Sequence, residues 1–89
     1  MAALDEIPGV EDIVRSCIVN EKRTHLFVSQ MLKIMFQNVT TGLSERSVRR
    51  FCLKHDIHAM SRLADCDIDY YVRKALTRYI IYNSYWLDQ

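Results

Sequence analysis

The chain has 89 residues, 49% hydrophobic and 26% charged, which is typical of one small globular domain. A domain of this length buries only about 60% of its unfolded surface, which argues against a large enzyme cleft and a small-molecule substrate. The net charge of +1 excludes a uniformly basic nucleic-acid-binding chain.

Apolar residues recur at helical spacing, and only two glycines and one proline interrupt the chain. Residues 1–7 are expected to form a flexible N-terminus. A proline suited to a first helical turn and the repeat behind it predict a helix over about residues 8–20. A second repeat, with Thr24 as its cap, predicts a helix over about residues 24–38. His25, isolated near the start of that helix, is expected to be solvated.

A third helix is predicted after a turn at Gly42, since glycine and its β-branched neighbours continue a helix poorly. Ser44 can cap this helix, with an acidic residue in the positive first turn. Its apolar stripe consists of Val48, Phe51 and Cys52. Arg46, Ser47, Arg50 and Lys54 therefore point to the opposite side, away from the core, and Arg49 lies on its flank.

A connecting segment and a long last helix complete the predicted fold. The apolar side chains of Ile57, Met60 and Leu63 are expected to touch the core. Asp65 or Asp67 can cap the last helix. The prediction is thus an all-α fold, a small four-helix helix-turn-helix in one domain over residues 1–89. Its parts are a three-helix core over residues 8–63 and a C-terminal helix over residues 65–87.

The charge is segregated along the chain. Residues 1–20 carry a net charge of −3, residues 21–54 carry +5, and residues 55–89 carry −1. The basic region thus includes the second and third helices, where a nucleic-acid partner would bind.

Two amphipathic helices, a turn with glycine and a capped basic helix form the pattern of a helix-turn-helix, whose second helix enters the major groove of DNA. The planar guanidinium of arginine can donate two hydrogen bonds to guanine. Arg46 and Arg50, one turn apart, are therefore expected at base edges. Phosphate contacts are expected from Ser44, Ser47, Arg49 and Lys54, with support from Lys22, Arg23 and Lys33.

The run LSERSVRRFCLKHDI resembles the helix-turn-helix that many transposases and integrases carry ahead of their catalytic core. FVSQMLKIMFQNVTTGLSERSVRRFCLKHDIH followed by RLADCDIDYYVRKAL is similar to the leading segment of eukaryotic integrase-core-domain proteins of transposon origin, over roughly residues 10–78. This resemblance implies DNA binding through Ser44, Arg46, Ser47, Arg49 and Arg50. In that family an RNase-H-like core with three metal-binding carboxylates follows, and this chain is expected to lack it. We therefore expect a nuclear DNA-binding module with no catalytic residues and no cofactor.

Other groups of residues suggest different chemistry. A zinc site can be composed from Cys52, His55, His58 and Cys66, but the order differs from that of the integrase zinc domain, and Cys52 belongs to the core stripe. A Cys52 nucleophile beside a histidine lacks a third residue to orient it. The acidic cluster at Asp65, Asp67 and Asp69 fits helix capping better than a hydrolytic metal site. No bound metal is expected.

The compartment and oligomeric state are inferred from composition. Three widely spaced cysteines in apolar stretches fit a reduced intracellular protein, and no apolar run approaches the ~20 residues of a membrane span, so no membrane partner is expected.

The last helix carries more aromatic residues than a small core can bury. This suggests a homodimer through Tyr79, Tyr82, Tyr85 and Trp86, although a helix lying across the bundle could also bury these rings. The alternative function is a helical protein-interaction or homodimerisation domain without nucleic-acid binding.

Overall fold

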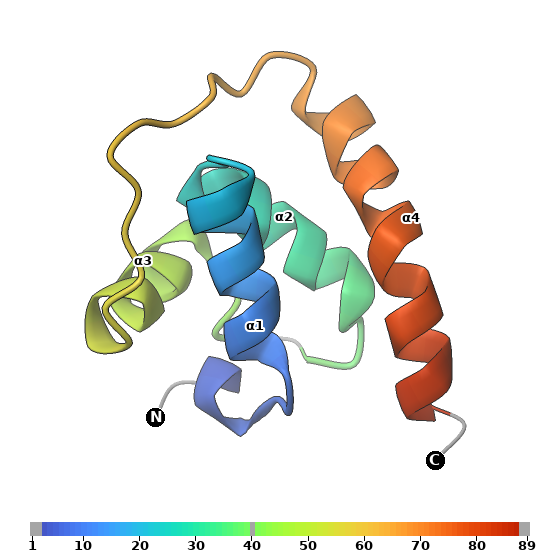
Figure 1. Ribbon diagram of the computed structural model, residues 1–89. Coiled ribbons are helices and arrows are strands. Elements are labelled where there is room, and N and C mark those ends of the chain that lie inside the picture. Colours follow the sequence, from blue (N-terminus) through green and yellow to red (C-terminus); the bar gives the residue numbers. More distant parts are fainter. Residues whose placement is uncertain (1–2, 40, 88–89) are drawn as a thin grey trace.

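The computed structural model describes residues 3–39 and 41–87, with side chains described over 4–39 and 41–77 (Figure 1). Over these residues the chain is all-α and has no strand. Its elements are η1 (Ala3–Glu6), α1 (Val10–Arg15), η2 (Ser16–Asn20), α2 (His25–Met35), α3 (Glu45–Lys54) and α4 (Ile68–Leu87). The predicted all-α fold with a long last helix is confirmed, and its assignment to the helix-turn-helix class stays a prediction.

The N-terminal segment differs from the expected flexible tail. Ala3–Glu6 form a 3-10 turn, and Leu4 is fully buried in the core. Ile7 also packs against the core. Burying these two side chains offsets the conformational entropy lost in ordering the segment, because each transfers apolar surface out of water.

The first predicted helix begins two residues later than expected. Gly9 has a φ of 78°, a left-handed conformation that glycine adopts without a steric penalty, so the proline before it lies outside α1. Arg15 and Ser16 keep helical backbone angles, and α1 therefore continues directly into η2. There the helix widens to a π-type turn, in which Glu21 N donates to Ser16 O at 3.0 Å.

The caps of α2 and α3 lie where the sequence predicts them. Thr24 Oγ1 accepts a hydrogen bond from Phe27 N at 3.1 Å, and Ser44 Oγ accepts one from Ser47 N at 3.2 Å. Gly42, with a φ of 83°, lies in the turn between the two helices. α2 ends at Met35 rather than near residue 38.

The hydrophobic core lies around α2, which contacts α3 along one part of its surface and α4 along another (Figure 1). All three predicted stripe residues of α3 are buried. The buried apolar residues are Leu4, Val10, Val14, Cys17, Ile18, Phe27, Val28, Met31, Leu32, Leu43, Val48, Phe51, Cys52, Ile57, Val72, Ala75 and Leu76.

The connection from α3 to α4 runs past the start of α2 (Figure 1). Leu63 N donates to Lys22 O at 2.7 Å, and the Thr24 hydroxyl donates to Asp65 Oδ1 at 2.6 Å. Asp65 therefore binds the cap residue of α2. Of the three apolar residues expected to touch the core here, only Ile57 is buried, whereas Met60 and Leu63 are exposed because the segment is held by polar contacts.

In the part of the chain that the structure describes, none of the helices combines the length and the apolar content needed to cross a membrane.

Candidate nucleic-acid interface

The basic face of α3 is held outward by the burial of its opposite face. Val48, Phe51 and Cys52 are buried, whereas Arg46 and Arg50 are exposed. Neither of these arginines forms a hydrogen bond or ion pair with any residue in the described part of the chain. Their guanidinium groups are therefore available to a partner, on a helix whose orientation is fixed by the core.

Arg49 lies on the same exposed face but has a partner on its own helix. Its Nη2 is 3.0 Å from Glu45 Oε1, four residues earlier. Both side chains are about half exposed, and such i,i+4 pairs typically contribute only about 0.3–0.5 kcal/mol. A phosphate could displace this carboxylate at small cost, because the pair is weak and in contact with solvent.

The two serines at the start of α3 are occupied by the cap. Ser44 Oγ accepts from the backbone of Ser47 and lies 3.1 Å from Ser47 Oγ. Ser44 is exposed and Ser47 is half-buried. The start of α3 is thus ordered before any partner binds.

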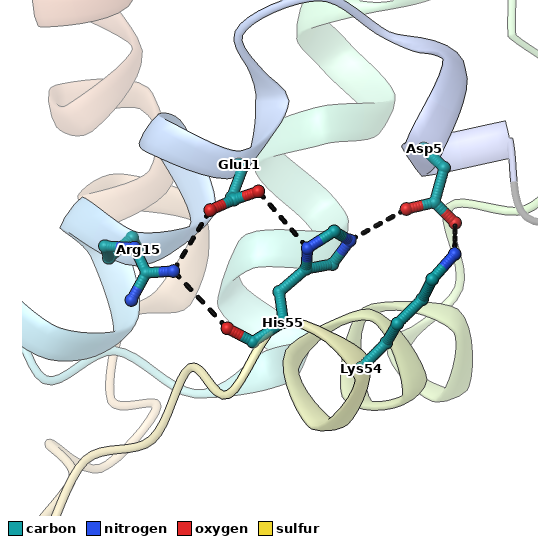
Figure 2. Close-up of polar contacts among 5 residues, drawn as sticks. All are labelled: Asp5, Glu11, Arg15, Lys54 and His55. Atoms are coloured by element: carbon teal, nitrogen blue, oxygen red, sulfur yellow. Dashed lines mark hydrogen bonds and ion pairs between the residues drawn. The ribbon is translucent and has the colours of Figure 1, made fainter.

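The end of α3 is tied to the N-terminal part of the chain by a network of ion pairs (Figure 2). The Lys54 ammonium lies 3.0 Å from Asp5 Oδ2. His55 lies between two carboxylates, with Nε2 at 2.8 Å from Asp5 and Nδ1 at 3.2 Å from Glu11. The hydrogen bond from His55, followed by that from Lys54, lowers the pKa of Asp5 below its ordinary value. Lys54, expected to contact phosphate, is thus shared with an acid of its own chain.

Arg15 completes this network from α1. Its Nη2 lies 3.1 Å from Glu11 and donates to His55 O at 3.4 Å (Figure 2). The backbone carbonyl at the end of α3 thereby gains a donor, which favours that helix terminus. The network joins η1, α1 and α3.

The three supporting basic residues lie in different environments. Arg23 is stacked between two rings, with its guanidinium carbon 4.6 Å from the centre of Phe27 and 4.9 Å from that of Tyr71. It therefore joins α2 to α4 rather than facing α3. Lys22 is half-buried beside the α3–α4 connection, and Lys33 is exposed in the last turn of α2.

The expectation that His25 is solvated is wrong. Its side chain is only 6% exposed, and Arg62 Nη1 lies 3.3 Å from its Nδ1. Burial lowers the pKa of His25, and the positive charges of Arg62 and Arg49 lower it further. Sequence reasoning missed Arg62, because its contact crosses 37 residues and no local spacing signals it.

Leu53 is a second residue that the sequence reasoning missed. It is 67% exposed and lies one turn beyond Arg49 and Arg50, on the outward face of α3. A solvent-exposed leucine within a basic face can pack against a thymine methyl group, the apolar feature of the major groove. The amphipathic pattern did contain a signal, since Leu53 falls outside the stripe of Val48, Phe51 and Cys52.

The residues considered for other chemistry are not arranged as reactive sites. Over the described residues, no three His, Cys, Asp or Glu side chains are placed to hold a metal ion. The nitrogens of His55 contact carboxylates. Burial raises the pKa of the Cys52 thiol to about 11, which disfavours the nucleophilic thiolate at neutral pH.

Comparisons with protein-family models, curated proteins and solved structures found no match to this chain. The aromatic residues expected at a dimer interface, Tyr79, Tyr82, Tyr85 and Trp86, lie beyond the residues whose side chains are described.

Proposed function

We propose that this chain is a DNA-binding helix-turn-helix module of transposase or integrase origin that acts in the nucleus and has no catalytic activity of its own. The observation that carries the proposal is the exposure of Arg46 and Arg50, without a partner in the described residues, on a helix whose other face is buried. The resemblance of residues 43–57 to transposase helix-turn-helix strings supports the same function.

In the proposed complex α3 lies in the major groove with its N-terminal turns toward the bases. Arg46 and Arg50 donate to guanine edges. Arg49 leaves Glu45 for a phosphate, and the Ser44 and Ser47 hydroxyls donate to the same strand. Lys54, in the last turn of α3, and Lys33, in the last turn of α2, contribute further positive charge. Arg23, stacked between two rings, contributes through the position of α4.

The test is fluorescence anisotropy of random and transposon-end duplexes over a salt series. We expect binding that falls steeply with salt, because each neutralised phosphate releases counterions. The variant Arg46→Ala/Arg50→Ala should bind at least about tenfold more weakly, since each base contact contributes about 1–3 kcal/mol. The matched control is Arg73→Ala/Lys74→Ala, which removes two exposed charges from α4. If the two double variants bound DNA equally well, α3 would not be the helix that contacts the bases.

A second proposal is that α4 mediates homodimerisation, alone or together with DNA binding. α4 has 20 residues and its partner α2 has 11, which corresponds to lengths of about 30 and 16 Å. The longer helix therefore extends past the partner that covers its first turns. Sedimentation equilibrium should give twice the monomer mass for the parent, and the monomer mass for Tyr82→Ala/Trp86→Ala. A parent that stays monomeric at high concentration would rule out this interface.

A further inference from the structure

The exposed connection between α3 and α4 contains an arginine that is held in a defined position. The guanidinium of Arg62 lies 3.3 Å from Nδ1 of His25, which is buried in the first turn of α2. Because a guanidinium has donors only, the ring nitrogen must accept, and the neutral imidazole carries its proton on Nε2. This contact fixes the location of the positive charge of Arg62.

That location is next to the start of α3. His25 and Ser29 are one turn apart on the same side of α2, a separation of roughly 6 Å. The Ser29 hydroxyl donates to Leu43 O at 2.6 Å, and Leu43 directly precedes the cap of α3. His25, which holds Arg62, therefore lies one turn along α2 from the residue that fixes the N-terminal end of α3, the end proposed to face the bases.

The connection that carries Arg62 is anchored at two further points. The neighbouring residue, Leu63, donates its N–H to Lys22 O at 2.7 Å, and Asp65 accepts from Thr24 at 2.6 Å. Both anchors lie on the segment that leads into α2. The backbone of Lys22 thus lies beside the residue that follows Arg62, although 40 residues separate Lys22 from Arg62 in the sequence.

Among the residues whose side chains the structure describes, no acid balances the charge of Arg62. No carboxylate within the described ranges pairs with it, and its contact with His25 uses one of five N–H groups. Arg62 and Arg49 both disfavour the protonated form of His25, after the larger effect of burial, whereas Glu45, the partner of Arg49, favours it. Because Arg49 is paired with Glu45, the charge of Arg62 is the one that lacks a carboxylate partner among the described residues, and it favours an anion.

We propose that Arg62 contacts the phosphate backbone of DNA and forms, with Lys22, a second anchoring point beside α3. This inference rests on the proposed function of α3. A helix in the major groove lies between two phosphate strands, and cations beside its N-terminal end fix its register on one of them. Because Arg62 comes from the α3–α4 connection, the contact surface spans more than the helix-turn-helix segment.

The test is the salt dependence of binding to a random-sequence duplex for Arg62→Gln and Arg73→Gln. Each variant removes one positive charge, from the α3–α4 connection and from α4 respectively. We expect Arg62→Gln to bind several-fold more weakly and to reduce the slope of log K against log salt by about 1. Arg73→Gln should keep the affinity and slope of the parent.

Comparing Arg62→Lys with Arg62→Gln separates a DNA contact from a purely structural role. Lysine keeps the charge but lacks the planar fork, so a phosphate contact predicts a salt slope close to that of the parent for Arg62→Lys and a reduced slope for Arg62→Gln. If Arg62 only positioned His25, both Arg62 variants would lower the melting temperature and leave the slope unchanged, and that result would overturn the inference. The inference would also be overturned if Arg62→Gln bound DNA with the same affinity and salt slope as Arg73→Gln while Arg46→Gln still weakened binding. In that case the proposed function of α3 would stand. A parent chain that binds no duplex at low salt would overturn both.

Discussion

The Asp5 carboxylate lies 2.8 Å from Nε2 of His55, and this contact ties the first helical turn of the chain to the end of α3 (Figure 2). The hydrogen bonds from His55 and then Lys54 lower the pKa of Asp5 below its ordinary value of 3.8. A carboxyl with a lowered folded-state pKa stabilises the fold above its unfolded pKa, and this contribution is lost as pH falls through the folded value. We therefore expect Asp5→Asn to lower the melting temperature above pH 3.8 and to differ progressively less from the parent below it.

Thermal melts followed by circular dichroism over an acid pH series measure this difference. Asp12→Asn is the matched control, because Asp12 is an exposed acid of α1. It should change the melting temperature little at any pH. A constant offset between Asp5→Asn and the parent down to the lowest pH would show that the ionised carboxylate does not stabilise the fold.

His25 also has a lowered folded-state pKa, because burial and the positive charges of Arg62 and Arg49 disfavour its protonated form. The unfolded chain then binds a proton that the folded chain excludes. Stability should be full above the ordinary value of 6.5 and should decrease as pH falls from there to the lowered folded value. The charged or titratable groups that act on His25 are Arg62, Arg49, Glu45 and His58.

In the variant His25→Gln this decrease should be smaller, because glutamine does not titrate and its amide oxygen can still accept from Arg62. Urea denaturation at several pH values below 6.5 gives the comparison with the parent. Identical pH profiles for His25→Gln and the parent would contradict a neutral buried His25.

The helices, two of their caps and the inward face of α3 could be predicted because the signals are local. Thr24 and Ser44 each bond to a backbone N–H three residues ahead, and the spacing of Val48 and Phe51 sets a face by helical geometry alone. The outward direction of Arg46 and Arg50 follows from the same pattern.

The rest depended on contacts between distant segments, which periodicity does not report. Asp5 reaches Lys54 across 49 residues, so one predicted DNA contact is shared with an acid that the sequence assigned to a flexible tail. Arg23 was expected at phosphate, yet it stacks on Tyr71 of α4. Arg62 is placed by a buried histidine that looked solvated in the sequence. Each case requires knowledge of which segments pack together.

Thr24 links two elements, since its hydroxyl oxygen caps α2 and its proton is donated to Asp65. Thr24→Ala should lower the free energy of unfolding by about 1 kcal/mol or more, because the cap and the tie to the α3–α4 connection are both lost. Thr24→Ser keeps the hydroxyl and should recover most of this. The control Thr77→Ala, at an exposed position of α4, should stay within about 0.5 kcal/mol of the parent in urea denaturation. Equal effects of Thr24→Ala and Thr77→Ala would contradict the capping role.

Ser29 fixes the turn between α2 and α3 by a buried hydrogen bond. Its side chain is 1% exposed, and its hydroxyl donates to Leu43 O at 2.6 Å. Ser29→Ala would leave that carbonyl without its donor in a dry environment, which should lower the free energy of unfolding by about 1–3 kcal/mol.

Urea denaturation should show a lower midpoint for Ser29→Ala with an unchanged m-value, since the fold and its buried area are retained. Ser61→Ala, in the exposed α3–α4 connection, is the matched control and should lie within about 0.5 kcal/mol of the parent. Because Leu43 adjoins the cap of α3, Ser29→Ala should also weaken the proposed DNA binding more than Ser61→Ala does. A stability equal to that of Ser61→Ala would mean that core packing alone, and not this hydrogen bond, sets the position of α3.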